Sequence, residues 1–197
     1  MEQNLKLETL NPSIMKTSEY GINLIKDLEG FHPSLYLNVA NNPAIGYGHT
    51  QGLRQSHKNN LKKNKPLTRQ EAHDLLLQDL EAIEPAVMDL LRRSPLVYVD
   101  GVIIGRQYQF DALVSFAYNC GTSALKHSGL AKAIADGMPE HIIRAQFESW
   151  CFVDDRPSPE LVHRRLLESD LYFGITYPEI IETNQNLLDN ETIPTYP

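Results

Sequence analysis

Cysteine is scarce in this chain of 197 residues, which holds only Cys120 and Cys151. Two cysteines so far apart have neither the close spacing of a zinc site nor the density of a disulfide framework. We therefore interpret them as two buried free thiols, with a single bridge between them as the alternative.

Long apolar runs are absent as well. No stretch of the sequence approaches the roughly 20 apolar residues of a membrane-spanning helix. The first residues, MEQNLKLETLNPS, lack the apolar core of a signal peptide. These absences predict a protein that is made in the cytoplasm without stable membrane insertion, so work outside the cytoplasm would need another route of release.

Positive charge does not dominate the composition either. The formal net charge is −7, which argues against nucleic acid as the partner. Residues 54–69 are an exception, because they contain six Lys or Arg and no acid. This segment is either a solvated loop or a region that attracts an anionic polymer. The hydrophobic share of 42% and the charged share of 22% are ordinary for a globular chain, and the length fits one domain with extensions.

Helical periodicity accounts for most of the chain. Thr17 or Ser18 is placed to cap the first helix, and Gly30 to stop it. Thr68 and Glu71 form a capping box ahead of a second, longer helix. The expected helices lie at about 17–30, 67–91, 105–121, 128–138, 139–151 and 159–174.

Other signals lie within and between these helices. Pro85 should kink or split the second helix. Residues 31–50, rich in Pro, Asn and Gly, favour a short irregular sheet of hairpin turns, and residues 153–159 are interpreted as a loop. Residues 1–14 should form a flexible arm and residues 175–197 an acidic tail, each either a floppy terminus or a docking segment for a delivery partner. The predicted fold class is α+β, mainly α.

Glu29 is the first candidate for chemistry, because no other carboxylate follows it up to Thr50. It stands beside Gly30, where the first helix should meet the small sheet. Clefts form at such seams, and partial burial there favours the protonated form of a carboxyl group. Taken alone, Glu29 is either a catalytic acid or a solvated residue at a helix end.

Several motifs follow one another in a distinctive order: LEGF at 28–31, IGYGHT at 45–50, QFDALVSFAYNCG at 109–121, a Trp after a short helix, and LVHRRLLESDLYF at 161–173. Together they resemble the phage-type lysozymes, glycoside hydrolase family 24, over about residues 15–174. The resemblance implies a two-lobed lysozyme-like domain with a small N-terminal β hairpin sheet and a helical C-terminal lobe.

The same resemblance implies a substrate and a place of action. Phage-type lysozymes hold a peptidoglycan glycan strand in a cleft between the lobes. They cleave the β-1,4 bond between N-acetylmuramic acid and N-acetylglucosamine without a metal or other cofactor. A monomer is expected, reaching the cell wall or periplasm through a holin pore, a secretion apparatus or host lysis. A structural component of a phage or secretion particle is the alternative from outside the enzyme class.

The family's catalytic signature is a Glu, eight residues, an Asp or Cys, five residues, and a Thr just before the IGYGH turn. Glu29 matches the Glu, Asn38 falls on the Asp position, and Ala44 falls on the Thr position. An amide cannot take up a proton at neutral pH, and an alanine side chain cannot hydrogen-bond a water molecule. Because general base catalysis typically contributes about 10²–10⁴-fold, the resemblance implies reduced activity for the chain as written.

These two substitutions leave several interpretations open. Hydrolysis persists if Asp154, Asp155 or the substrate's own N-acetyl group takes over the missing role. Alternatively, Glu29 alone acts as acid and then as base in a lytic transglycosylase, or the protein binds peptidoglycan without cutting it. Deliberate inactivation of an enzyme would produce the same two changes.

Four further residues are candidates for substrate binding because of their places in the motifs. They are Gly48 and His49 in the GYGHT turn, and Tyr118 and Asn119 at the end of a core helix. An amide at that helix end can bond a sugar acetamido group. Each has a structural alternative, with His49 pinning the turn and the helix-end pair serving only in packing.

The last motif region has its own expectations. Trp150 is interpreted as a core residue rather than a sugar-stacking one. Arg164 and Arg165 should form ion pairs with Glu168 or another surface acid. Where relatives usually have a Gly-rich loop, this chain has DDRPSPE, whose prolines stiffen the backbone and whose acids would reshape one wall of the cleft.

Overall fold

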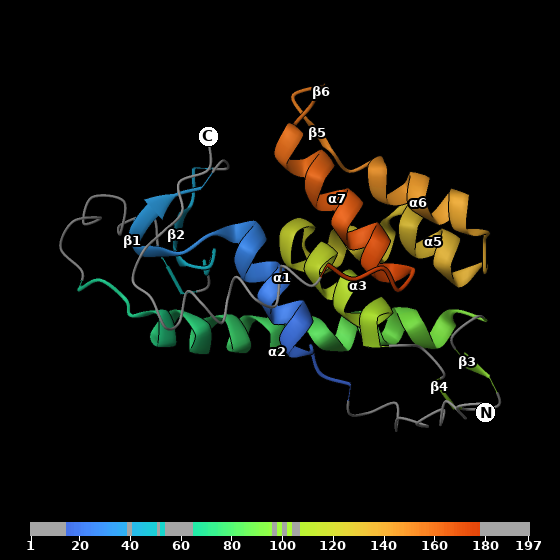
Figure 1. Ribbon diagram of the computed structural model, residues 1–197, viewed down its shortest axis with the longest axis horizontal. Helices are drawn as coiled ribbons and strands as arrows, with labels where there is room; N and C mark the ends of the chain where they lie inside the picture. Colours follow the sequence, from blue (N-terminus) through green and yellow to red (C-terminus); the bar gives the residue numbers. More distant parts are fainter. Residues whose placement is uncertain are drawn as a thin grey trace. The chain divides into compact units, whose positions relative to one another are not determined.

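Figure 1 shows the computed structural model of the chain. It describes most of the sequence: residues 15–38, 41–50, 52–53, 65–95, 98–99, 102–103 and 107–177. The predicted N-terminal arm, nearly all of the predicted acidic tail and most of the basic segment lie outside these ranges. What was expected of those three segments stays a prediction.

Seven helices and three pairs of short strands make up the part of the chain that the structure describes. The helices are α1 (Glu19–Glu29), α2 (Arg69–Arg93), α3 (Gln107–Cys120), α4 (Thr122–His127), α5 (Gly129–Ala135), α6 (Glu140–Glu148) and α7 (Pro159–Tyr172). The strands are β1 (His32–Leu37), β2 (Pro43–Gly46), β3 (Tyr98–Val99), β4 (Val102–Ile103), β5 (Phe152–Val153) and β6 (Arg156–Pro157). The mainly helical α+β fold expected from the sequence is confirmed. None of the described helices is both long and apolar enough to span a membrane.

The described residues divide into two compact units, in agreement with the expected two-lobed organisation. One, called here the helical unit, contains the residues up to Gly21 together with Ile83–Thr176. The other, called the hairpin unit, contains Ile22–Ala82. Both boundaries fall inside helices, so α1 and α2 each contribute residues to both units.

The core of the helical unit is built around α3. The eight consecutive residues from Phe110 to Ala117 are all buried, because apolar side chains occur all round this helix. Its main packing partner is α7, and α6 in turn packs on α7 and α5. Phe116 and Phe147 meet edge to face in this core, with ring centroids 5.8 Å apart. Gly121, at φ 89°, follows the end of α3 as predicted.

The beginning of α1 is fixed by side chains of the helical unit. Ser18 caps the helix, since its hydroxyl accepts a hydrogen bond from Gly21 N at 3.2 Å. The backbone N–H of Ser18 donates to Asp111 at 2.9 Å, and that of Thr17 donates to Glu84 at 2.8 Å. Burial raises the pKa of Asp111, and its hydrogen bonds from Ser18 oppose this rise. Local capping and long-range contacts therefore select the same starting residue.

We predict that Gly21→Ala destabilises the fold, although alanine has the higher helix propensity. A Cβ at this position would lie 2.8 Å from the Cβ and Cγ atoms of Asp111 and 2.9 Å from the Thr17 methyl group. Overpacking costs about 1–3 kcal/mol, against a propensity gain of about 1 kcal/mol. Urea unfolding followed by circular dichroism measures the change, with Gln78→Ala on the exposed side of α2 as the control. A Gly21→Ala protein as stable as the wild type would contradict this packing.

The helix α2 is not split at Pro85. It runs as one element from Arg69 to Arg93 with the proline inside it, so of the two predicted alternatives the split is wrong and the kink stays a prediction. A proline in a helix interior removes one backbone hydrogen bond and costs about 3 kcal/mol. Apolar side chains on both sides of it, Leu80, Val87 and Leu91, are buried, and their burial offsets that cost.

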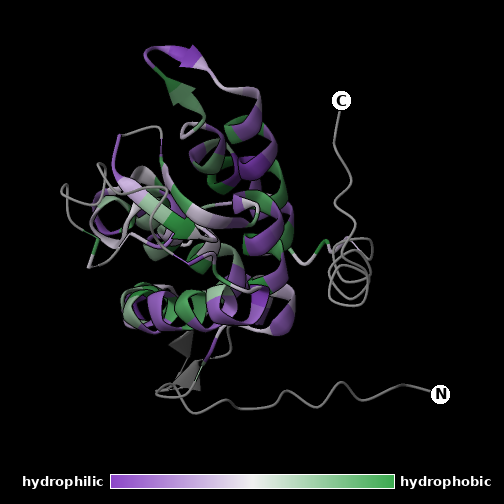
Figure 2. Ribbon diagram, turned by 90° about the vertical axis from the view of Figure 1, so that its left-hand side faces the viewer, coloured by the Kyte–Doolittle hydropathy of each residue, from purple (hydrophilic) through white to green (hydrophobic). Residues whose placement is uncertain are grey.

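The segment predicted as a loop after α6 forms a small hairpin instead. β5 pairs with β6, and Asp154 and Asp155 make the turn at φ 48° and 61°. Positive φ at both positions is typical of a two-residue hairpin turn, which usually contains Asn or Gly. The hairpin projects beyond the start of α7, and its strands differ in hydropathy, β5 being apolar and β6 polar (Figures 1 and 2). The hairpin expected at 31–50 is therefore one of three strand pairs in the described residues.

Both cysteines are free, as expected, but they differ in burial. Cys151 is buried, whereas Cys120 is only half-buried at the end of α3, which corrects the prediction of two buried thiols. Burial raises the pKa of the Cys120 thiol above its ordinary value, and the nearby charge of Arg165 opposes the rise. Cys120 is therefore held mainly as a neutral thiol.

Candidate active site

Glu29 is the last residue of α1 and is half-buried. Gly30, at φ 69°, ends the helix and donates its N–H to the carbonyl of Lys26 at 3.0 Å. The chain then enters β1 within three residues. Burial, and then the charge of Glu29, raise the pKa of the Tyr36 hydroxyl on this strand. Glu29 and Tyr36 are thus electrostatic neighbours.

The hairpin of β1 and β2 carries the other two predicted catalytic positions. Tyr36 lies opposite Ala44 in the antiparallel register, and Asn38 follows β1 at the turn. The side-chain oxygen of Asn38 accepts a hydrogen bond from Asn42 N at 2.9 Å, and its backbone N–H donates to Asn42 O at 2.9 Å. Asn38 therefore closes the turn, and its amide oxygen already serves one donor.

Tyr36 lies near all three predicted catalytic positions, although the sequence reasoning gave it no role. The charge of Glu29 adds to the rise in the pKa of its hydroxyl. Ala44 lies opposite it in the hairpin, and Asn38 follows it by two residues. Ala44 is fully buried, so its side chain faces packed atoms rather than solvent. The only sequence signal for Tyr36 was its place between the LEGF and IGYGHT motifs. The catalytic roles of Glu29, Asn38 and Ala44 stay predictions.

A cluster of aromatic and basic side chains fixes this hairpin within its unit. The rings of Phe31 and Tyr47 lie 5.6 Å apart, centroid to centroid. Arg69 stands 4.6 Å over the Phe31 ring, and Lys26 stands 5.7 Å over the Tyr47 ring. Burial raises the pKa of the Tyr47 hydroxyl, while its hydrogen bond with Arg69 opposes the rise. The cluster joins both ends of the hairpin to the end of α1 and the start of α2.

The GYGH turn is pinned to α2. Gly46 has φ 68°, and a Cβ there would lie 3.1 Å from the Ala72 Cβ, so the backbone approaches the helix closely. His49 Nδ1 lies 2.9 Å from each carboxylate oxygen of Asp79, a buried residue of α2. The structural alternative that the sequence left open for His49 is therefore present. Substrate binding by Gly48 and His49 stays a prediction.

We predict that Asp79→Asn destabilises the protein by about 1–3 kcal/mol. The substitution replaces a charge-assisted hydrogen bond to His49 with a weaker neutral one, inside a largely buried pair. The midpoint of urea unfolding measures the change. Asp74→Asn, at an exposed site on the same helix, is the matched control and should stay within about 0.5 kcal/mol of the wild type. Equal midpoints for the two variants would mean that the pair contributes little.

Tyr118 and Asn119 lie in the last turn of α3, which belongs to the helical unit. Tyr118 is half-buried and Asn119 is exposed. The side-chain oxygen of Asn119 accepts a hydrogen bond from Arg165 of α7. The sequence reasoning missed this contact, because 46 residues separate the two. Substrate binding by Tyr118 and Asn119 stays a prediction.

Arg164 and Arg165 both pair with Glu168, as predicted, but Glu168 is fully buried rather than a surface acid. Arg164 Nε lies 3.0 Å from Oε1, which also accepts a hydrogen bond from the Ser115 hydroxyl at 2.7 Å. Arg165 pairs with the other carboxylate oxygen, and its guanidinium carbon stands 4.7 Å over the Phe116 ring. The buried carboxylate is therefore satisfied on both oxygens, as a buried charge must be.

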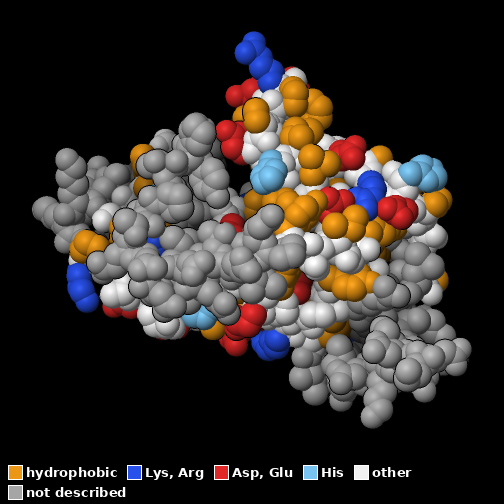
Figure 3. Space-filling model, in the orientation of Figure 1, with side chains coloured by type: hydrophobic (Ala, Val, Ile, Leu, Met, Phe, Trp, Pro, Cys, Tyr) orange, Lys and Arg blue, Asp and Glu red, His pale blue; other side chains and the backbone are white. Residues whose placement is uncertain are grey.

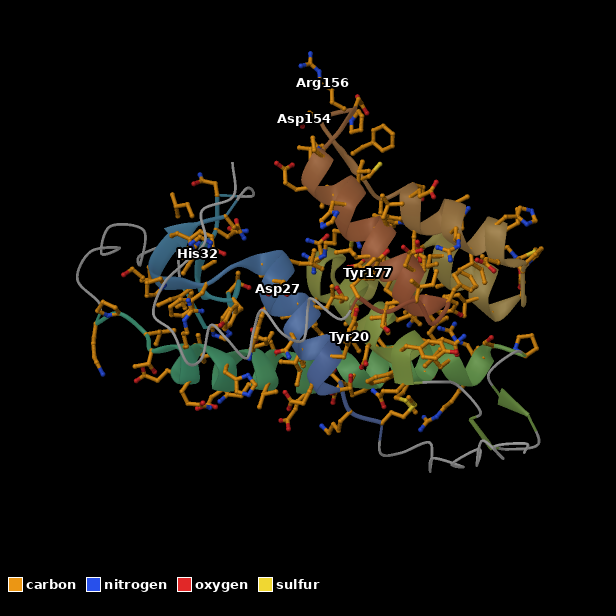
Figure 4. All side chains as sticks on the ribbon, in the orientation of Figure 1. Tyr20, Asp27, His32, Asp154, Arg156 and Tyr177 are labelled. Carbon is orange, nitrogen blue, oxygen red and sulfur yellow. The ribbon has the colours of Figure 1, made fainter. Side chains whose placement is uncertain are left out.

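The tip of the β5–β6 hairpin holds the acids considered as substitutes for the missing base. Asp154 and Asp155 are exposed there, and Figure 4 shows Asp154 and Arg156 projecting from the tip. In Figure 3 hydrophobic, acidic and basic side chains gather at this end of the helical unit. Help from these acids in hydrolysis stays a prediction. Within the described residues no group of His, Cys, Asp or Glu could hold a metal ion.

Comparisons with known proteins identify relatives of this chain. A family described as Phage lysozyme matches residues 26–168. The endolysin of Bacillus phage PZA is 32% identical over 160 residues, which cover 80% of this chain and 55% of that protein. The chain thus spans about half the length of the first curated relatives that it matches.

Solved structures give the same assignment over nearly their whole length. The endolysin from Escherichia coli O157:H7 phage FAHEc1 is 29% identical with a TM-score of 0.65, covering 83% of this chain and 97% of that one. The muramidase domain of SpmX from Asticaccaulis excentricus is 28% identical with a TM-score of 0.65, covering 81% of this chain and 98% of that one. From residue 26 to residue 168, therefore, this chain belongs to the phage lysozyme family.

Proposed function

We propose that this protein is a muramidase-type glycoside hydrolase that cleaves the β-1,4 bond between N-acetylmuramic acid and N-acetylglucosamine in peptidoglycan. The observation that carries the proposal is the position of Glu29, half-buried at the end of α1 and close enough for its charge to add to the rise that burial causes in the pKa of Tyr36 on the β1–β2 hairpin. Family membership supports it, as does the likeness to a solved muramidase domain. With endolysins among its relatives, we place its action at the cell wall after release.

Glu29 takes the role of the acid. In glycoside hydrolysis by inversion, a carboxylic acid protonates the leaving oxygen while a carboxylate on the opposite face of the sugar activates a water molecule. Glu29 suits the first role because it ends α1 directly before the hairpin that carries the other two signature positions. Asn38 and Ala44 stand where the family has the groups that activate water.

The second role is poorly filled, so we propose a reduced rate. The Asn38 amide cannot accept the proton of water at neutral pH, and its oxygen already accepts a hydrogen bond from Asn42 N. Ala44 has no hydroxyl and is fully buried. Loss of general base catalysis lowers a rate by about 10²–10⁴-fold. Cleavage by Glu29 alone, as in a transglycosylase, avoids this loss because a sugar hydroxyl replaces the water.

A binding function without cleavage is the second candidate. It is favoured by the same observation, since a turn closed by Asn38 and a buried Ala44 preserve the fold of the hairpin without the groups of the reaction. In this case the protein would retain affinity for peptidoglycan and lack turnover. The two functions therefore differ in products rather than in ligand.

Glu29→Gln tests the enzymatic proposal. Release of soluble muropeptides from purified peptidoglycan should be weak in the wild type and fall to background in this variant, because the amide has no acidic proton to transfer to the leaving oxygen. Glu19→Gln, at the exposed first turn of the same helix, is the matched control and should keep the wild-type rate. If Glu29→Gln cleaves as fast as the wild type, the assignment of the acid is wrong.

Retention on purified sacculi separates the two candidates further. Wild type and Glu29→Gln should both sediment with the sacculi, since Glu29 serves the reaction and other residues share the binding. Retention without any soluble product favours the binding function. Absence of retention would count against both candidates and leave a structural role in a particle.

A further inference from the structure

We propose that Asn119 meets the glycan only as a hydrogen-bond donor, and that the buried Arg165 is the positioning residue that fixes this orientation. The inference rests on the proposed function, because it takes a peptidoglycan glycan as the ligand. It specifies which partner donates the hydrogen bond between protein and glycan, and which residue fixes the orientation of the donor. The matching group on the ligand is then an acceptor oxygen.

The side-chain amide of Asn119 has a donor end and an acceptor end, and Arg165 accepts only one arrangement. A guanidinium group carries five N–H donors and no acceptor. The Asn119 atom that faces Arg165 Nη2 must therefore be the carbonyl oxygen, which is the atom in hydrogen-bonding position. The thiol of Cys120, 3.6 Å from the same oxygen, is also a donor there. A thiol can donate or accept, so the guanidinium alone selects the orientation of the amide.

Arg165 is itself held from several sides. Its side chain is 1% exposed and pairs with Glu168 through Nη1. Its Nε donates to the carbonyl of Trp150 at 3.3 Å, and its guanidinium carbon lies 4.7 Å from the centroid of the Phe116 ring. A planar guanidinium cannot turn away from Asn119 without giving up one of these contacts. The buried Arg165 side chain is thus fixed in place, and it fixes the orientation of the exposed Asn119 amide in turn.

The nitrogen of the Asn119 amide is consequently the end directed outward. The residue is exposed although its oxygen is engaged with a buried partner. An exposed asparagine ordinarily offers a donor or an acceptor as the ligand requires, whereas this one offers its two N–H groups. The strongest acceptors on the glycan are the acetamido carbonyl oxygen of either sugar and, in strands without peptides, the lactyl carboxylate of N-acetylmuramic acid.

Asn119→Asp separates the donor from the acceptor. The variant keeps an oxygen for Arg165 and replaces the outward nitrogen by a carboxylate oxygen, which repels an acceptor. In a Glu29→Gln background, which prevents cleavage, isothermal titration calorimetry with peptide-free glycan strands should show binding weakened by at least about tenfold, as in Asn119→Ala. The melting temperature of Asn119→Asp should stay the same or rise, because the hydrogen bond with the charged Arg165 becomes an ion pair.

Ser123→Asp is the charge control, since Ser123 is exposed on the neighbouring helix α4; it should bind as tightly as the background. The inference is overturned if Asn119→Asp binds the glycan as tightly as the background protein does. It is also overturned if Ser123→Asp loses as much affinity as Asn119→Asp. Chitotetraose, which has no lactyl group, distinguishes the sources. Weakening toward both ligands assigns the acetamido carbonyl, and weakening toward glycan strands alone assigns the carboxylate. A background protein that binds neither ligand overturns the proposed function, and this inference with it.

Arg165→Lys and Arg164→Lys form a matched pair for the positioning role. Both arginines are buried on α7 and donate to Glu168, and Arg165 donates to Asn119 as well. Both variants should lower the melting temperature. Only Arg165→Lys should also weaken glycan binding and increase the mobility of the Asn119 side-chain amide, measured by nitrogen-15 relaxation. Equal effects of the two variants on that amide would overturn the role of Arg165.

Discussion

Asn38→Asp combined with Ala44→Thr is expected to raise the release of soluble muropeptides by at least about a hundredfold. The new carboxylate would supply the group that activates water. It would also keep the hydrogen bond from Asn42 N, because a carboxylate accepts that bond at least as well as an amide. Most of the gain should come from Asn38→Asp alone. Ala44 is fully buried, so a threonine there needs both space and a partner for its hydroxyl.

Two further variants make this result specific. Asn41→Asp places a carboxylate in the same turn, at φ 58°, a conformation that both Asn and Asp tolerate, and it should leave the rate unchanged. Adding Glu29→Gln to the double variant should return the rate to background. Mass spectrometry of the products reports the reaction, with reducing ends for hydrolysis and anhydro-muramic ends for transglycosylation. A double variant that gains nothing would replace the enzymatic proposal by the binding one.

Glu168→Gln should lower the melting temperature by about 6–20 °C. Removing one partner of a buried ion pair costs about 3–5 kcal/mol, and each kcal/mol shifts the midpoint of a protein of this size by about 2–4 °C. Here one carboxylate serves both Arg164 and Arg165 and also accepts the hydroxyl of Ser115. A glutamine side chain would retain one acceptor oxygen. Its NH₂ group would then face an N–H or O–H donor that the second carboxylate oxygen now accepts.

The control for this prediction is Glu148→Gln, which makes the same chemical change at an exposed position on α6. It should move the melting temperature by no more than about 2 °C, as is usual for a surface substitution. Differential scanning calorimetry measures both variants. Similar small shifts in the two would mean that the arginines find other partners when Glu168 is lost.

The features that the sequence predicted correctly are those decided within a few residues. The capping box forms as expected, with Thr68 N donating to Glu71 at 2.7 Å and Glu71 N donating to the Thr68 hydroxyl at 3.1 Å. Gly30 and Gly121 follow the ends of α1 and α3 at positive φ. In each case one backbone conformation and one neighbouring side chain suffice, so the local pattern of residues carries the information.

The features that were missed depend on residues far apart in the chain. Pro85 breaks no helix because buried neighbours on α2 offset its cost, and burial is a property of the whole fold. Asp79, the partner of His49, lies 30 residues away from it. The contact of Arg165 with Asn119 requires α3 and α7 to pack together. No spacing in the sequence reports either of these two contacts or the burial around Pro85.

The boundaries between the two units lie inside α1 and α2 rather than in linkers, where separable domains usually begin and end. Transplanting the whole hairpin unit between relatives would therefore cut two helices in mid-course and expose four unpaired backbone groups at each new end. The segment from Gly30 to Thr50 starts instead at a natural helix stop. A change of activity that leaves both helices intact is therefore expected from single substitutions within that short segment, which contains Asn38 and Ala44.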